Sequence, residues 1–99
     1  QGREAGFRHP VVVVSAQRIL SAGPSVVYVV PLTSTVRGFH AELTIEPDRH
    51  NGLIVRSAAQ CQHLRAVSTG RIVSARGNVG PATLAQIRET IAIMLDIPV

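Results

Sequence analysis

Residues 10–14 of the chain are Pro-Val-Val-Val-Val, and residues 26–32 are Val-Val-Tyr-Val-Val-Pro-Leu. Such runs of β-branched and other apolar side chains are typical of strands that are buried on both faces. The turn residues Ser21-Ala22-Gly23-Pro24 separate them. Pro31 cannot donate a hydrogen bond to a neighbouring strand, so we expect it at an edge or near the end of its strand. The two runs predict a fold built on a sheet.

The middle of the chain carries the signals of shorter strands. Residues 42–46 alternate between apolar and polar side chains, which predicts a half-exposed antiparallel strand. The pair Asn51-Gly52 predicts a tight turn, and residues 53–55 (Leu-Ile-Val) predict a fourth short strand. We expect a polar turn over residues 57–62, and we expect residues 64–68 to pair back into the sheet.

The clearest single element is a helix near the C-terminus. Gly80-Pro81 is a typical helix start, because proline at the first helical position already has the required backbone conformation. Apolar residues then recur at helical spacing in one stripe, and Pro98 ends the helix; the stripe consists of Leu84, Ile87, Ile91 and Leu95. Strands followed by an amphipathic helix predict a mainly β fold with a C-terminal α-helix, in which the helix packs on a small barrel.

Length and composition limit the class of protein. The 99 residues, of which 45% are hydrophobic and 16% charged, have room for one folded domain over residues 1–99 and are too apolar for a disordered chain. No apolar run approaches the ~18 residues of a membrane-spanning helix, so we expect no membrane partner. The single cysteine, Cys61, excludes an internal disulfide framework, suits a reducing cytosol and is expected to be a buried small residue.

The charge balance favours an anionic partner. The chain has ten basic residues, all of them arginine, against six acidic ones, which gives a net charge of +4. Because a guanidinium group matches phosphate oxygens two at a time, RNA, DNA or an acidic peptide would suit this surface. A genome rich in G and C, which encodes arginine in place of lysine, is the alternative explanation. An aromatic content of 3% argues against modules that stack bases on aromatic rings.

Several catalytic motifs are absent from the sequence. It contains no phosphate-binding glycine loop, no HExxH motif and no GxSxG motif between a strand and a helix. His50 and His63 are isolated, and the carboxylates form no pair. The sequence therefore predicts neither a metal site nor a cofactor, and it disfavours glycosidase chemistry.

Two polar clusters remain, one at an end of each long apolar run. Residues 6–10 (Gly-Phe-Arg-His-Pro) precede the first run, and residues 31–38 (Pro-Leu-Thr-Ser-Thr-Val-Arg-Gly) follow the second. In an antiparallel sheet these two ends can lie at the same edge, so Arg8, His9 and Thr33 can meet there. Solvated strand ends and ordinary turn residues would give the same pattern, so the clusters alone do not identify a site.

The clusters and the segments that follow them resemble the MazF/PemK-type toxins of bacterial toxin–antitoxin modules. The resemblance covers essentially the whole chain in the same order. The stretches that carry it are Glu4-Ala5-Gly6, Arg8-His9-Pro10-Val11-Val12-Val13-Val14-Ser15, Val30-Pro31-Leu32-Thr33-Ser34, Cys61-Gln62-His63-Leu64-Arg65-Ala66-Val67, Arg71-Ile72, and the helix from Pro81 to Ile97. The resemblance implies a small SH3-like barrel with a C-terminal helix that acts as a homodimer in the cytoplasm.

The resemblance also implies an activity and a partner. Such toxins are sequence-specific, metal-independent endoribonucleases that cut single-stranded RNA: the ribose 2′-hydroxyl attacks the neighbouring phosphate and leaves a 2′,3′-cyclic phosphate and a 5′-hydroxyl end. A cognate antitoxin neutralises each toxin by laying an acidic, disordered tail across the basic RNA groove. Family members normally begin with a strand that is missing before Gln1. We therefore expect further residues upstream; the alternative is a barrel with an open edge.

Two residues of the family's active site have counterparts here, one of them displaced. Thr33 matches the threonine of the family's Pro-Leu-Thr motif, whereas His9 replaces the arginine directly before the strand-opening proline, and Arg8 lies one residue further away. The reaction needs a base, an acid and positive charge near the phosphate. Because free histidine titrates near ~6.5, we expect His9 to transfer protons, Arg8 to hold the phosphate, and Thr33 to donate a hydrogen bond to a phosphate oxygen. Alternatively, Arg8 acts alone and His9 is a bystander.

The family binds RNA through the loop after the second run and through its C-terminal half. By this comparison the expected RNA-binding residues are Ser34, Thr35, Arg37, His63 and Arg65. Arg37 lies beside Gly38, which suits a phosphate contact, although a solvated loop arginine would give the same pattern.

Two other functions are compatible with the same fold. CcdB-type toxins poison DNA gyrase through the end of the helix, including a tryptophan; this chain has no tryptophan and ends in Asp96-Ile97-Pro98-Val99, which disfavours that function. A catalytically inactive relative that only binds nucleic acid or an antitoxin remains an alternative, because of the Arg-His-Pro order at residues 8–10.

Overall fold

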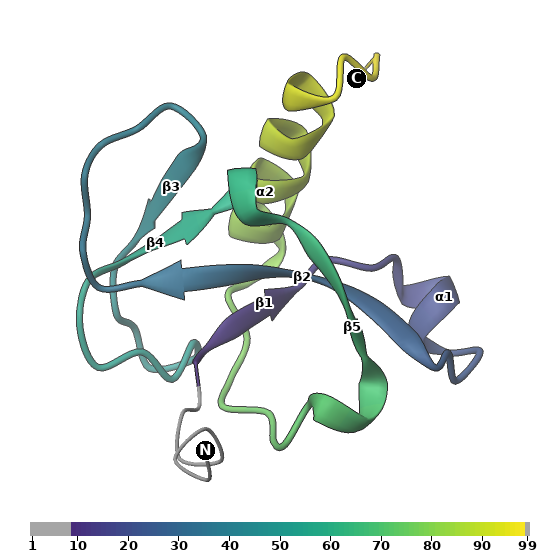
Figure 1. Ribbon diagram of the computed structural model, residues 1–99. Helices are drawn as coiled ribbons and strands as arrows, with labels where there is room; N and C mark the ends of the chain where they lie inside the picture. Colours follow the sequence, from purple (N-terminus) through teal and green to yellow (C-terminus); the bar gives the residue numbers. More distant parts are fainter. Residues whose placement is uncertain (1–8, 99) are drawn as a thin grey trace, which may run out of the picture.

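The computed structural model describes residues 9–98 (Figure 1). Residues 1–8 and 99 lie outside the description, and with them the candidate site residue Arg8. The strands of the described part are β1 (Val11–Val13), β2 (Val26–Thr33), β3 (Glu42–Ile45), β4 (Ser57–Gln60) and β5 (Arg65–Ser68). Its helices are α1 (Gln17–Leu20), α2 (Pro81–Met94) and the single 3-10 turns η2 (Cys61–His63) and η3 (Thr69–Arg71).

Strand β2 is the centre of an antiparallel sheet. It pairs with β1 along one edge, where Val12 lies opposite Val30. Along its other edge it pairs first with β5 and then with β4, which in turn pairs with β3. The strands predicted at residues 11–14, 26–32, 42–46 and 64–68 are therefore confirmed.

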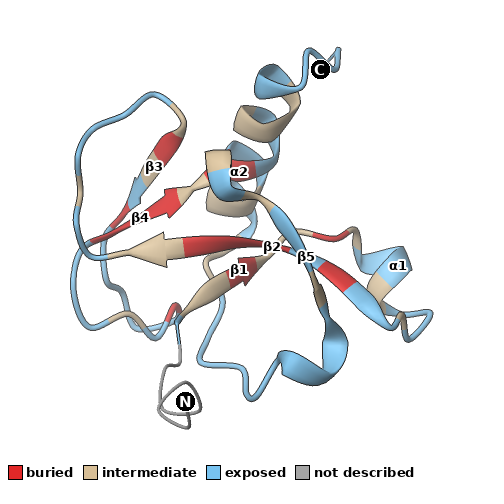
Figure 2. Cartoon of the chain, in the orientation of Figure 1, coloured by how far each residue is buried: buried red, intermediate tan, exposed pale blue. Residues whose placement is uncertain are grey.

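The sheet curls around a single apolar core, so the predicted mainly β, barrel-like architecture with a C-terminal helix is confirmed. Buried side chains from β1, β2, β3, β4, η2 and α2 meet in one cluster of Val12, Val30, Ile45, Ala59, Cys61 and Ile87. Figure 2 shows the buried residues concentrated in the middle of the sheet and on the helix face next to it. Burial raises the pKa of the Cys61 thiol, which keeps it protonated at neutral pH and agrees with its predicted role as a core residue.

Helix α2 closes the core. Its side chain Ile87 is fully buried, and Leu84 and Ile91 pack against the cluster on either side of it. Burying one such side chain contributes about 1.5–3 kcal/mol. Arg88 fastens the same helix to the sheet, because its Nε and Nη2 atoms donate to the carbonyl oxygens of Val14 and Ser15 at 3.2 and 3.0 Å.

The helix ends earlier than the position of Pro98 suggests. Asp96 has a left-handed φ of 58°, the Ile97 amide donates to the Ala92 carbonyl at 2.8 Å, and the Asp96 amide donates to the Ile93 carbonyl at 3.1 Å. This pattern of two bonds around a left-handed residue is a Schellman motif, which terminates helices. The predicted apolar stripe is therefore wrong at Leu95, which lies beyond α2 and is 58% exposed.

The fourth strand lies elsewhere than predicted. Residues 53–55 form no strand, and Ile54 is 84% exposed. The strand is instead β4, within the predicted polar turn, where the small residues Ser57, Ala58 and Ala59 are buried. Strand β4 lies inside the sheet, hydrogen-bonded to β2 on one side and to β3 on the other. The short helix α1 was not predicted.

The predicted turn at Asn51-Gly52 is confirmed, and a distant loop packs against it. The Asp48 carboxylate accepts hydrogen bonds from the amides of His50 and Asn51 at 2.7 and 2.8 Å. A Cβ atom on Gly77 would lie 2.3 Å from the His50 carbonyl oxygen, and one on Gly52 would lie 2.4 Å from the carbonyl oxygen of Arg76. Both glycines thus allow two backbones to touch. Within residues 9–98, no helix is long and apolar enough to cross a membrane.

Replacing Gly77 by alanine tests this backbone contact. The added methyl group would overlap the His50 carbonyl oxygen at 2.3 Å, so we expect Gly77→Ala to lower the free energy of unfolding by about 1–3 kcal/mol. Gly70→Ala is the matched control, because the nearest atom to its added Cβ is Ser68 Oγ at 3.8 Å. Urea unfolding of both variants measures the difference; equal stability of the two would contradict the contact.

Candidate active site

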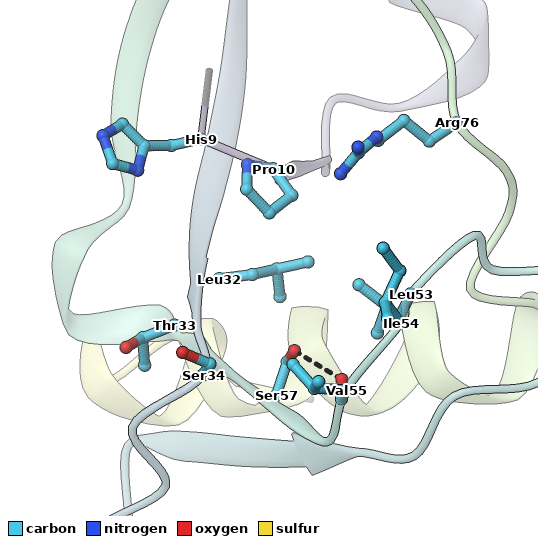
Figure 3. Close-up of a pocket in the computed structure, with 10 residues that line it drawn as sticks. All are labelled: His9, Pro10, Leu32, Thr33, Ser34, Leu53, Ile54, Val55, Ser57 and Arg76. Atoms are coloured by element: carbon cyan, nitrogen blue, oxygen red, sulfur yellow. Dashed lines mark hydrogen bonds between the residues drawn. The ribbon is translucent and has the colours of Figure 1, made fainter. Parts of the chain in front are cut away.

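A pocket of about 410 Å³ opens at the edge of the sheet where β1 begins and β2 ends. Four segments surround it: the start of β1, the end of β2, the stretch before β4, and the loop before α2 (Figure 3). Its lining residues are His9, Pro10, Leu32, Thr33, Ser34, Leu53, Ile54, Val55, Ser57 and Arg76. A volume of this size is typical of sites for small ligands or for part of a larger one.

The pairing of β1 with β2 brings the two predicted polar clusters to this pocket. Val11 lies opposite Pro31, and the Leu32 amide donates to the Pro10 carbonyl at 3.0 Å, so the chain before β1 runs alongside the end of β2. His9 and Thr33 consequently line the same pocket, as expected from the sequence. Arg8 lies outside the described residues.

Hydroxyl groups on one side of the pocket have defined partners. The Oγ1 atom of Thr33 accepts a hydrogen bond from the Thr35 amide at 3.1 Å. Because the oxygen acts as acceptor there, the hydroxyl hydrogen can still be donated to a ligand. The Ser57 hydroxyl donates to the Val55 carbonyl at 2.9 Å, which holds the stretch before β4 in place (Figure 3).

The charge of the pocket suits an anion. Arg76 is permanently charged, and none of the described residues that line the pocket is acidic. His9 adds an imidazole, a side chain of the kind that transfers protons in enzymes. A positively charged, partly apolar pocket with several hydroxyl groups can bind a phosphate together with the apolar face of a base or sugar.

Arg37, a predicted RNA-binding residue, forms an ion pair with a buried carboxylate. Its guanidinium lies 2.5 Å from Oε2 of Glu42, whose side chain is 1% exposed, and stacks on the Phe39 ring at 4.5 Å. The same Glu42 oxygen accepts hydrogen bonds from Gln62 Nε2 at 2.6 Å and Gln60 Nε2 at 3.4 Å. The bonds from Gln62 and Arg37 lower the pKa of Glu42. Arg37 keeps 41% of its side chain exposed.

The remaining predicted RNA-binding residues are spread over two regions. Ser34 lines the pocket and Thr35 follows it in the same loop. His63 ends η2 and Arg65 begins β5, where Arg65 lies opposite Val29 on the other half of β2. Both side chains are exposed, and neither lines the pocket.

Sequence patterns missed half of the pocket, including its arginine. The sequence predicts a short strand at Leu53, Ile54 and Val55 and a turn that includes Ser57. Arg76 had no local signal at all, because it stands in a polar stretch without periodicity. The neighbouring Gly77 was the available sign of a close backbone approach. Among residues 9–98, no three His, Cys, Asp or Glu side chains are grouped as metal ligands.

Comparisons with known proteins agree with this architecture. The model of the family described as "PemK-like, MazF-like toxin of type II toxin-antitoxin system" matches residues 1–95. Endoribonuclease MazF9 of Mycobacterium tuberculosis is 33% identical over 101 residues, which cover 98% of this chain and 86% of that protein.

Solved structures resemble the fold at lower sequence identity. The Mycobacterium tuberculosis toxin MazF-mt6 has a TM-score of 0.78 at 22% identity, with 92% of this chain and 89% of the other covered. A MazE-MazF crystal structure from Deinococcus radiodurans has a TM-score of 0.75 at 21% identity, with 91% and 84% covered. At these identities the likeness concerns the fold.

The stability of the chain should depend on the Glu42 carboxylate at acidic pH. Its pKa is lowered in the folded protein, so its contribution is complete above the unfolded value near 4.5 and is lost as the pH falls through the folded value. In urea unfolding between pH 7 and pH 3, we expect the wild type to lose more stability than Glu42→Gln, whose amide cannot be protonated. Glu89→Gln, which removes an exposed carboxylate on α2, is the matched control and should follow the wild type. Parallel curves for the wild type and Glu42→Gln would contradict the assignment.

Proposed function

Because the chain belongs to the PemK-like, MazF-like toxins of type II toxin–antitoxin systems, we propose that its pocket cuts single-stranded RNA at specific sequences without a metal ion. The chain is an endoribonuclease of this family. In the proposed reaction the ribose 2′-hydroxyl attacks the adjacent phosphate and the 5′-oxygen departs, which leaves a 2′,3′-cyclic phosphate and a 5′-hydroxyl end. The observation that carries the proposal is that His9 and Thr33 line one pocket. Among the described residues, no acidic side chain lines this pocket.

The lining residues supply what this reaction needs. The nucleophile belongs to the substrate, so the protein has to move protons and to stabilise the negative charge that develops on the phosphate. His9 takes the proton of the 2′-hydroxyl or returns one to the departing oxygen. Thr33 donates its hydroxyl hydrogen to a non-bridging phosphate oxygen while its Oγ1 stays fixed by the Thr35 amide. Arg8, next to His9 in the sequence, holds the phosphate in this proposal.

The proposed macromolecular partners are a second copy of the chain and an acidic antitoxin. The related Deinococcus radiodurans structure contains MazE with MazF. An acidic, disordered antitoxin tail would be attracted by the net charge of +4 and would compete with RNA for the pocket. We place the protein in the cytoplasm, where its RNA substrates are.

The surface proposed for the second copy is the end of α2. Four large apolar side chains are exposed there: Ile93 at 65%, Leu95 at 58%, Ile97 at 51% and Met94 at 43%. Contiguous exposed apolar residues mark interaction surfaces, because leaving them in water is unfavourable. A two-fold contact between two such ends would cover them.

Cleavage of RNA in the presence of EDTA tests the proposed function. We expect the wild-type protein to cut a mixed single-stranded RNA and to leave cyclic-phosphate and 5′-hydroxyl ends, which end-specific labelling identifies. His9→Ala should lower kcat by about a hundred- to ten-thousandfold, because it removes proton transfer. Thr33→Ala should lower kcat by about tenfold or more, because it removes one hydrogen bond to the phosphate.

Matched controls separate these effects from changes of folding. His50→Ala and Thr44→Ala remove the same groups from exposed positions outside the pocket and should keep wild-type rates. Intact RNA after incubation with the wild type would contradict the proposal. In that case, trapping of gyrase on DNA would indicate a CcdB-type function, and its absence an inactive binding relative. Full activity of His9→Ala would assign the chemistry to Arg8 alone.

The oligomeric state tests the proposed dimer surface. Light scattering on the wild type should give about twice the 10.6 kDa chain mass. Ile93→Asp places a charge on the exposed apolar end of α2 and should shift the mass to that of one chain. Ile19→Asp, at another exposed apolar position (46%) on α1, is the control and should remain dimeric. A dimeric Ile93→Asp protein would place the contact elsewhere.

A further inference from the structure

The loop before α2 delivers one charged side chain to the pocket. Arg76 lies in this loop, far along the chain from the two strand ends, and Figure 3 shows its side chain directed toward the pocket from the side opposite His9. Of the ten pocket-lining residues it is the one with a permanent positive charge. Neither the family comparison nor the sequence pattern assigns it a role.

The backbone on both sides of Arg76 is held in place. Its carbonyl oxygen would lie 2.4 Å from a Cβ on Gly52, and the next residue, Gly77, is in similarly close contact with the His50 carbonyl. The Asn78 amide donates to that same carbonyl at 2.7 Å. The turn over residues 48–52 is itself fixed by the Asp48 and Asn51 side chains. A side chain on such a rigid support is positioned before any ligand arrives, which lowers the entropic cost of binding.

The guanidinium of Arg76 is not used to stabilise the fold. Within residues 9–98, Arg37 pairs with Glu42, Arg56 pairs with Glu46 at 3.1 Å, and Arg88 bonds to two carbonyl oxygens. Arg76 has no ion pair and no side-chain hydrogen bond in this part of the chain, and its residue is exposed. An arginine that is rigidly placed at a pocket without a protein partner is suited to an anionic ligand.

An apolar wall lies next to this charge. Ile54 is 84% and Val55 is 52% exposed, and both line the pocket together with Leu53. Side chains of this kind are costly to leave in water and provide a surface for the flat face of a nucleobase. A nucleotide has both required parts, an anionic phosphate and a flat apolar base.

We propose that Arg76 binds a backbone phosphate of the RNA while Ile54 and Val55 contact the base of the nucleotide attached to it. The inference rests on the proposed function and deepens it, because it adds a second phosphate-binding position to the pocket, opposite His9 and Thr33. Arg76 is thereby an RNA-binding residue, and the wall before β4 is part of the surface that selects the base.

The test compares Arg76→Ala with the wild type in two assays. In steady-state cleavage of a short RNA, KM should rise by about ten- to a hundredfold with little change in kcat, since a charge-assisted contact to the substrate is lost. In the second assay, fluorescence anisotropy measures binding of a mixed-sequence pool of 2′-O-methyl oligonucleotides, which lack the attacking hydroxyl. The slope of log K against log salt should fall in magnitude by about 0.7, the value for one phosphate on a single strand.

Two further variants separate a specific contact from a general effect of charge. Arg18→Ala removes an exposed arginine on α1, at the other end of the sheet from the pocket, and should keep the wild-type KM and salt slope. Arg76→Lys keeps the charge without the two-pronged geometry and should recover the salt slope and part of the affinity. Thermal unfolding of all variants verifies that they remain folded.

The outcomes distinguish this inference from the proposed function. Wild-type KM and wild-type salt slope in Arg76→Ala would overturn the role of Arg76 while leaving the ribonuclease proposal intact. If the wild type binds the pool without cutting RNA, the proposed function fails. The comparison of pool binding by Arg76→Ala and by the wild type then still tests the role of Arg76. A glutamate-rich peptide that competes with RNA gives a further outcome. If Arg76→Ala binds the pool with wild-type affinity but the peptide no longer displaces the pool from this variant, Arg76 contacts the antitoxin, and the RNA assignment is wrong.

Discussion

The antiparallel pairing of β1 with β2 is the interaction on which the core and the pocket both depend. It places Val12 opposite Val30, and both side chains are buried in the same cluster as Ile87. A shift of the register by one residue would turn every side chain of β1 to the other face of the sheet. The register that buries these valines also runs His9 alongside the end of β2, where Thr33 lies.

A second constraint is the close contact between the turn at residues 48–52 and the loop before α2. It requires glycine at positions 52 and 77, since a Cβ at either would lie under 2.5 Å from a carbonyl oxygen. The contact lies outside the core cluster, although the nearby Leu53 and Val79 pack against that cluster, and it completes the pocket by holding Arg76 at its rim. The same backbone packing thus fixes the fold of this region and the position of Arg76 at the pocket.

Local sequence patterns predicted the correct element where a single physical effect acts over several neighbouring residues. The valine runs of β1 and β2 and the Pro81 start of α2 were predicted because burial and helical geometry act over many neighbouring residues. The signals failed at residues 53–60, where apolar side chains are exposed and small ones are buried. Hydrophobicity measures the tendency of a side chain to leave water, whereas β4 is buried because of its central position between β2 and β3 in the sheet.

By itself the sequence determined the order of strands and helix, the family, and the position of His9 and Thr33 at the same end of neighbouring strands. Only the tertiary structure decided that Arg76 joins them and that Arg37 is bonded to the buried Glu42. Partners separated in the chain are chosen by backbone contact and hydrogen-bond geometry, which have no periodic signature. Arginines that look alike in the sequence therefore differ in the folded chain: Arg37 and Arg88 hold the structure, and Arg76 faces the pocket.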